Sequence, residues 1–368
     1  EREKKNSILI KRALGSTKFE RIKPDAPFFF FSGISIEGRT EYDAGINLQL
    51  LFPEMTIGFV TARDSINVGF TEKELMQNIN FIVTETEAEI RNKFSLGDKD
   101  ARDWTVPTAK KDAIANIQIV RPTTCAYRPF DNRMTFYTGN SRGLYASPQR
   151  KIMQHLLNRN NIALTLTRTI EGDRQFADAF LFNNIVQLHS LSIKEVNSLA
   201  PLYLYSESKP TDMFGASPPT PLHNVERGAK ARGSKGKDTL SPPLHVMERG
   251  PGGEVPNLNP EIVAAIAGKI ALKFEDDGAS AALSDRRKRP TKTFAPIDLL
   301  DYIYGVLHSP NYREKYKEFL KIDFPRVPYP TSAKEFWAFA ELGGELRALH
   351  LMESPKLTKP ITKFSVSG

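Results

Sequence analysis

The chain has 368 residues, 40% hydrophobic and 26% charged, which is enough to bury the cores of about two domains. Its single cysteine, Cys125, excludes a disulfide framework and a cysteine-based zinc site, and no apolar run approaches the roughly 20 residues of a membrane-spanning helix. We therefore expect a cytoplasmic protein with no membrane partner. The net charge of +8 favours an anionic partner.

The first residues lack an initiator methionine and the charged-then-apolar order of a signal peptide, so we expect a segment of a longer polypeptide. Short apolar runs then alternate with turn residues, which predicts strands at 55–60 and 66–70. The turn between them carries Arg63 and Asp64, where a functional contact and a plain solvated turn both fit.

Helices are predicted after these strands. Thr71 and Glu74 have the spacing of a capping box, and apolar residues follow at helical intervals at Leu75, Ile79 and Ile82. Two further helical stretches are expected at 87–94 and 108–117.

The central region begins with the motif YRPFDNR at 127–133, for which we predict a turn between strands at 117–120 and 134–137. The rings of Tyr127, Pro129 and Phe130 would pin this turn into the core, with Arg128 and Asp131 neutralising each other. Phosphate contact by the arginines is the equal alternative.

A helix is predicted next, with Ser147 as N-cap and Pro148 as its first residue. Arg150 and Lys151 would lie in its first turn, where positive charge opposes the helix dipole unless an anion is close. The two residues could therefore contact phosphate, although a solvated face also accounts for them.

A β-hairpin is predicted from two strands, 161–168 and 176–186, on either side of the polar tip TIEGDRQ. Arg168, Arg174 and Gln175 at this tip suit the major groove, where arginine reads guanine and glutamine reads adenine. Any surface hairpin has a polar tip, so base reading remains one of two interpretations.

Composition divides the chain into three parts. Residues 1–205 form the predicted α/β region, and 206–258 are rich in Pro, Gly and Lys and predict a flexible insertion. The remainder, 259–368, is predicted to be helical and to pack on the first region. N-caps are expected there at Ser309, before Pro310, and at Ser332, paired with Glu335.

Positive charge is concentrated at 121–191, which holds nine basic residues. Aromatic residues, Tyr137 among them, lie between these arginines. Guanidinium groups bind phosphate and guanine edges in pairs of hydrogen bonds, and rings can stack on bases, so we predict double-stranded DNA as the partner.

Several catalytic motifs are absent. There is no GxxxxGK[ST] loop, no HExxH, no GxSxG and no glycine-rich cofactor loop between a strand and a helix. We therefore assign no catalytic residue, metal or cofactor to this chain. Two alternatives stay open: a nuclease or methyltransferase fragment with an unrecognised active site, and a helical protein-interaction scaffold.

Three stretches carry a family resemblance: YRPFDNRMTFY with SRGLYASPQRKIMQHLL, then NNIALTLTRTIEGDRQFADAFLFNNIVQLHSLS with PLYLY, and finally PNLNPE with DLLDYIYGVLHSPNYREKYKEFLKIDFPRVPYP. The chain resembles the C-terminal target recognition (specificity) domain of type ISP restriction-modification enzymes and of related adenine-specific DNA methyltransferases. The likeness extends over about 56–351. The insertion after Ser206 departs from the family pattern.

The resemblance implies a domain that selects a DNA sequence for an upstream methyltransferase domain of the same polypeptide, with S-adenosylmethionine as that domain's cofactor. The implied DNA-backbone contacts are Arg128, Arg133, Arg142, Arg150 and Lys151, with Tyr137 beside them. The implied base contacts are Arg168, Arg174 and Gln175. The expected fold is α+β: a mixed twisted sheet with DNA-facing hairpins and a C-terminal helical bundle packed behind.

Overall fold

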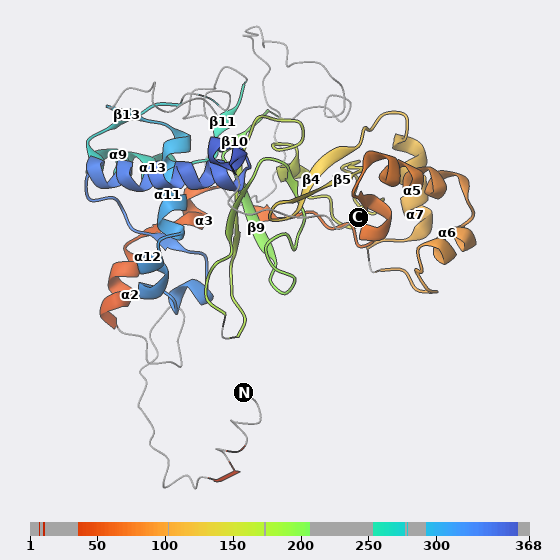
Figure 1. Ribbon diagram of the computed structural model, residues 1–368, viewed down its shortest axis with the longest axis horizontal. Helices are drawn as coiled ribbons and strands as arrows, with labels where there is room; N and C mark the ends of the chain where they lie inside the picture. Colours follow the sequence, from red (N-terminus) through yellow and green to blue (C-terminus); the bar gives the residue numbers. More distant parts are fainter. Residues whose placement is uncertain are drawn as a thin grey trace, which may run out of the picture. The chain divides into compact units, whose positions relative to one another are not determined.

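Figure 1 shows the computed structural model, which describes residues 36–101, 103–172, 174–206, 253–276 and 292–359 and positions 7, 10, 11 and 278. The chain divides into two compact units, Glu1–Asp43 and Ala44–Gly368. The first contains helix α2 (Ile36–Asp43), within which Arg39 and Asp43 form an ion pair. The sheets belong to the second unit. Because 207–252 lie outside the described residues, the three-part division at 205 and 258 stays a prediction.

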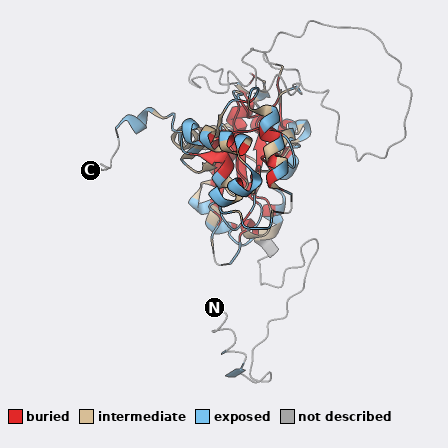
Figure 2. Cartoon of the chain, turned by 90° about the vertical axis from the view of Figure 1, so that its right-hand side faces the viewer, coloured by how far each residue is buried: buried red, intermediate tan, exposed pale blue. Residues whose placement is uncertain are grey.

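The first four-stranded sheet is antiparallel and contains the predicted hairpin. Its strands, in spatial order, are β2 (Thr56–Ile57), β9 (Asn197–Pro201), β6 (Ala163–Thr167) and β7 (Ala179–Phe182). Every residue of β6 and β7 is buried, including the polar Thr165 and Thr167, so the alternation of leucine and threonine in β6 does not mark a solvent-facing side. Figure 2 shows the buried residues gathered in the interior. The antiparallel pairing of β6 with β7 confirms the predicted hairpin, but its second strand ends at Phe182, whereas the predicted strand ran to 186. Ile185 and Val186 pair in the other four-stranded sheet.

The second four-stranded sheet is mixed and contains the YRPFDNR motif. The turn in this motif is only Pro129 and Phe130, because one strand runs through Arg128 and the next begins at Asp131, so the turn predicted over 127–133 is too long. Its strands are β3 (Val68–Gly69), β5 (Asp131–Thr135), β4 (Thr123–Arg128) and β8 (Ile185–Val186), and β4 and β8 run parallel. The register shifts between Ala126 and Arg128, just before the turn.

The two sheets meet at the segment after β2. The Phe59 amide donates to the Val186 carbonyl at 2.9 Å, and the Val60 amide donates to Ser147 at 2.7 Å. A Cβ on Gly58 would lie 2.6 Å from the Gln187 backbone, so only glycine permits this approach. The ring of Phe59 is fully buried in the core shared by both sheets.

Three helices lie beside the mixed sheet: α5 (Glu72–Thr84), which packs on β3 and β5, and then α6 (Glu87–Lys93) and α7 (Val106–Asn116) (Figure 1). Thr71 caps α5 as predicted, accepting the Glu74 amide at 3.1 Å. The Glu74 carboxylate accepts from Phe70, one residue before the position expected of a capping box.

Two local predictions are wrong. Residues 117–120 form the end of α7 and a turn, because the amides of Ile117 and Ile119 bond back to Ala113 and Asn116. Ser147 is no N-cap, because its amide and carbonyl pair with Val60. The helix after it, α8 (Arg150–Met153), begins at Arg150 and has only four residues, so it has little dipole to oppose.

The C-terminal helices pack closely. They are α9 (Pro260–Ile270), α11 (Pro296–Leu307), α12 (Pro310–Lys315) and α13 (Ala333–His350), with Ser309 and Ser332 as N-caps as predicted. Gly343 of α13 lies against α11, and the Arg347 guanidinium bonds both oxygens of the buried Asp301 at 2.7 and 3.0 Å.

Further short elements lie among the described residues, and the α+β prediction is confirmed. The remaining strand pairs are β1 (Ile46–Asn47) with β14 (Arg326–Val327), β10 (Tyr203–Leu204) with β11 (Val255–Pro256), and β12 (Lys273–Phe274) with β13 (Thr293–Phe294). The remaining helical turns are α3 (Leu48–Leu51), α4 (Asp64–Asn67), η4 (Phe319–Lys321) and η5 (Pro355–Thr358). Within the described residues, no helix has the length and apolar character to cross a bilayer.

Candidate nucleic-acid interface

Aromatic rings and arginines alternate across the mixed sheet. The guanidinium of Arg133 lies 4.3 Å from the ring centre of Phe70 and 4.0 Å from that of Tyr127, and the guanidinium of Arg128 lies 4.3 Å from the Tyr127 ring. We call Phe70, Arg133, Tyr127 and Arg128 the cation–ring column. Phe70 directly follows β3, Arg133 lies on β5, and Tyr127 and Arg128 lie on β4. These three strands are neighbours in the sheet, in the order β3, β5, β4.

Hydrogen bonds fix the middle of the column. The Tyr127 hydroxyl donates to Asp64 at 2.9 Å, and burial followed by this bond raises the pKa of Tyr127. The Asp131 carboxylate forms an ion pair with Arg133, with a shortest contact of 2.8 Å. The prediction that Asp131 and Arg128 neutralise each other is therefore wrong. The Arg128 guanidinium donates to the Tyr127 carbonyl at 2.6 Å and to the Gln187 side-chain oxygen at 3.4 Å.

The loop after β5 presents Arg142 to solvent. Arg142 has a left-handed φ of 56°, and its loop is held from inside by the buried carboxylate of Asp112 on α7. This carboxylate accepts the Thr138 hydroxyl at 2.8 Å and the Leu144 amide at 2.9 Å. A Cβ on Gly143 would lie 2.3 Å from Asp112 Oδ2, so the loop closes onto the carboxylate only with glycine there.

Arg150 and Lys151 follow on α8. The Arg150 side chain lies beside the same loop, with Cδ 3.6 Å from where a Cβ on Gly139 would stand. Lys151 pairs with Glu54 at 2.7 Å, but its side chain is 75% exposed. Exposed ion pairs contribute only about 0.2–1 kcal/mol, so a phosphate can displace Glu54.

The tip of the β6–β7 hairpin is held to the C-terminal region at its first end. The Ile170 amide donates to the Lys321 carbonyl at 3.0 Å, and Arg168 pairs with Asp323 at 2.8 Å. Arg168 remains 60% exposed, and Gln175 is exposed. The tip therefore lies against the C-terminal region, with the side chains of Arg168 and Gln175 still open to solvent.

Arg174 is committed to internal contacts. It bonds both oxygens of Asp178 at 3.0 Å and Glu195 at 2.6 Å, and both carboxylates are buried. Burial alone would raise the pKa of Glu195, but hydrogen bonds from the Ser192 hydroxyl, the Glu171 amide and Arg174 hold that pKa at about 2. The Arg174 guanidinium, itself 40% exposed, therefore already pairs with two buried carboxylates, and the base contact predicted for it stays a prediction.

Tyr137 is also internal. It is fully buried, its hydroxyl donates to the Pro148 carbonyl at 2.8 Å, and its ring packs 5.1 Å from that of Tyr145. Burial raises the pKa of Tyr137. The predicted DNA contact by Tyr137 is wrong, since the ring belongs to the core that joins the two sheets.

Three of the predicted cations stand out. In the part of the chain that the structure describes, Arg128, Arg142 and Arg150 form no ion pair with a carboxylate. Arg133, Lys151 and Arg168 each have one acidic partner at a partly exposed position. The arrangement thus offers free or displaceable positive charge along the mixed sheet, the loop at 138–144 and α8.

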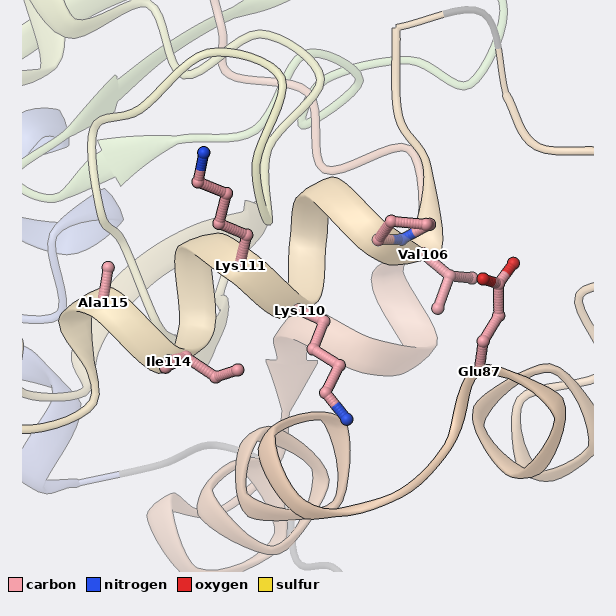
Figure 3. Close-up of a pocket in the computed structure, with 7 residues that line it drawn as sticks. Glu87, Val106, Lys110, Lys111, Ile114 and Ala115 are labelled. Carbon is pink, nitrogen blue, oxygen red and sulfur yellow. The ribbon is translucent and has the colours of Figure 1, made fainter.

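Two hollows have a different character. One, of about 510 Å³, lies along α7 and is lined mainly by apolar atoms of Val106, Pro107, Ile114 and Ala115; Figure 3 shows the Lys110 and Lys111 side chains pointing apart. The other, of about 490 Å³, lies beside Arg168 and Glu195. Among the described residues, no group of three His, Cys, Asp or Glu could hold a metal ion.

Sequence reasoning missed Asp112 and Phe70. Asp112 is an ordinary acid in a helix until the loop some 30 residues later folds over it, so no local signal marks it. Phe70 is 71% exposed and follows an apolar strand, where the sequence suggests only a core residue. The spacing of Arg174 and Asp178, four residues apart, was the one available sign of their ion pair.

The family described as Type ISP C-terminal specificity domain matches residues 50–368. This chain belongs to that family. The resemblance inferred from the sequence is therefore confirmed. No curated protein is similar enough in sequence to match.

Solved structures share the fold of this specificity domain. It is similar to a DrdV–DNA complex (19% identity, TM-score 0.56, covering 95% of this chain and 29% of that one). It is also similar to a nuclease-deletion mutant of the Type ISP restriction-modification enzyme LlaGI in complex with a DNA substrate mimic (16%, 0.53, 95% and 27%). A third is the ATP-dependent Type ISP restriction-modification enzyme LlaBIII bound to DNA (18%, 0.51, 88% and 18%). The chain thus spans less than a third of each of these proteins.

Proposed function

We propose that this specificity domain binds double-stranded DNA and selects the target sequence of a larger restriction-modification enzyme. The observation that carries the proposal is the set of three arginines, Arg128, Arg142 and Arg150, that have no carboxylate partner among the residues the structure describes. A guanidinium group with no carboxylate beside it can bind phosphate without first breaking an ion pair, and it can do so through two parallel hydrogen bonds.

The roles divide by chemistry. Arg128, Arg142, Arg150 and Lys151 contact the sugar-phosphate backbone and set the orientation of the domain, with Arg133 supporting the column beside them. Arg168 and Gln175, the exposed side chains of the hairpin tip, are the candidates for base contacts. DNA binding would displace Glu54 from Lys151 and Asp323 from Arg168. The free-energy cost is small, because ion pairs at exposed positions are weak.

The parent protein is proposed to be a bacterial, cytoplasmic, adenine-specific DNA methyltransferase of the restriction-modification class. Its methyltransferase domain would lie upstream in the same polypeptide and hold S-adenosylmethionine. The support is the family membership and the DNA-bound enzymes that share the fold. This chain would supply target choice, and no catalytic residue is assigned to it.

The test has two parts. Binding of the chain to a pool of duplexes with a randomised centre, followed by repeated selection and sequencing, is expected to enrich one sequence. The affinity for that duplex is then measured across a salt series, where about 0.9 of slope in log K against log salt corresponds to each phosphate contact. Three or more contacts predict a slope of about −3 or steeper. A pool that stays random, or an affinity independent of salt, contradicts the proposal.

A further inference from the structure

Phe70 is the exposed end of the cation–ring column. Its side chain is 71% exposed, although the neighbouring members of the column are partly buried. A single exposed apolar residue is ordinary on a protein surface. Phe70 differs because one of its faces carries the Arg133 guanidinium at 4.3 Å, which orients the ring without burying it.

The column is rigid along its length. Arg133 lies between two rings, and Asp131 holds its guanidinium by three bonds of 2.8–3.1 Å. Tyr127 is anchored through its hydroxyl to Asp64. Behind Phe70 the backbone is fixed too, because its amide donates to Glu74 at 2.8 Å and a Cβ on Gly69 would meet Leu75 at 3.1 Å.

We propose that the open face of Phe70 stacks on a nucleobase of the bound DNA. Every base presents a flat π-face, and a ring already backed by a guanidinium is a suitable platform for one. Arg128, at the other end of the column and with no carboxylate partner among the described residues, supplies positive charge for the phosphodiester backbone of the same DNA. A base that is partly unstacked or turned out of the duplex would meet the ring face-on.

The inference rests on the proposed DNA-binding function, and its test separates the two. The probe is the selected duplex carrying 2-aminopurine at successive positions, because stacking on a protein ring changes the fluorescence of this base. For the intact chain we expect a fluorescence change at one position or two neighbouring positions. In Phe70→Ala and Phe70→Leu that change is lost and affinity falls about tenfold, or about 1.4 kcal/mol, which is the size of one base–ring stack.

Matched variants keep the test interpretable. Phe70→Trp retains an aromatic face and should keep both the signal and the affinity. Ile193→Ala removes another exposed apolar side chain, 77% exposed, and should change neither. Thermal melting of each variant confirms folding, and Phe70→Leu preserves apolar bulk over Arg133 if Phe70→Ala melts early.

The outcomes are distinct. Selective binding with no response to Phe70→Leu overturns the stacking inference and leaves target recognition intact. If the intact chain shows no selective binding, the proposed function is wrong, and the stacking inference that rests on it is wrong as well. Equal losses in Phe70→Leu and Phe70→Trp would mean that the position contributes packing, which also contradicts stacking.

Discussion

Asp112 Oδ2 accepts the backbone amide of Leu144 at 2.9 Å, which joins helix α7 to the loop that carries Arg142. The other carboxylate oxygen, Oδ1, accepts hydrogen bonds from the side-chain amides of Asn140 at 2.8 Å and Asn116 at 2.9 Å. A buried, charged acceptor with this many donors is a strong local constraint, because each bond to a charged group contributes about 1.5–3 kcal/mol. The position of the exposed arginine therefore depends on an acid in a different element.

Asp112→Asn tests this dependence. The amide NH₂ of asparagine would face donors that now bind oxygen, so we expect a loss of about 1–3 kcal/mol in the free energy of unfolding. With the loop loosened, the DNA affinity should fall and the salt slope should shrink by about 0.9, the contribution of one phosphate contact. Urea melts and binding titrations measure the two effects. A variant that is destabilised but binds DNA with an unchanged slope would show that the loop position does not matter for binding.

Arg142, which has no carboxylate partner among the described residues, should behave differently from Arg174, which has two. Arg142→Asn removes the charge, and asparagine tolerates the left-handed backbone of this position, so folding should be unchanged while affinity falls and the salt slope decreases by about 0.9. Arg174→Ala should instead destabilise the fold by about 3–5 kcal/mol, because it strands two buried carboxylates. Lys273→Ala, an exposed paired cation on β12, is the control and should change neither. Arg174→Ala with native stability would contradict the structural role.

What could be predicted from the sequence was local. The β6–β7 hairpin follows from two apolar runs around a polar tip, and the caps at Thr71, Ser309 and Ser332 need only the residues next to them. The arginine-rich character of the central region is likewise a property of composition.

What the sequence could not show has a non-local cause. Tyr137 and Arg174 read as ligand contacts because their ring and charge are visible in the sequence, whereas the Pro148 carbonyl and Glu195 that satisfy them are assigned by the fold. Ser147 matched an N-cap pattern, but Val60, far away in the sequence, takes its backbone bonds. Residue type identifies which groups can bind DNA, and tertiary contacts decide which of them remain available.

Close helix contact predicts opposite effects at two glycines. A Cβ on Gly343 would stand 1.9 Å from the Asp301 carbonyl of α11, so Gly343→Ala must separate the helices and should cost about 1–3 kcal/mol or more. Gly268, in the interior of α9, has nothing within 4 Å of an added Cβ, and Gly268→Ala should stabilise by about 0.5–1 kcal/mol. Thermal or urea denaturation of the Gly343→Ala and Gly268→Ala variants measures the two changes in the free energy of unfolding. Similar effects of the two substitutions would be incompatible with the α11–α13 contact.

Acid should destabilise the domain through His155. Its Nδ1 accepts the Tyr205 amide at 3.0 Å, and burial, followed by the nearby charges of Arg159 and Lys151, lowers its pKa from 6.5 to about 4. The unfolded chain therefore binds the proton more readily than the folded one. Stability from this residue is present above pH 6.5 and is lost as the pH falls toward 4.

His155→Asn isolates this contribution, because the asparagine Oδ1 can occupy the acceptor position of Nδ1 and does not titrate. Between pH 7.5 and 5.0 the intact chain should lose about 2 kcal/mol more stability than the variant, since each pH unit below 6.5 contributes about 1.4 kcal/mol. His308, whose pKa burial also lowers to about 4, is present in both proteins and cancels in the comparison. Urea melts at the two pH values provide the measurement. Equal losses in both proteins would mean that His155 is not what makes the fold acid-sensitive.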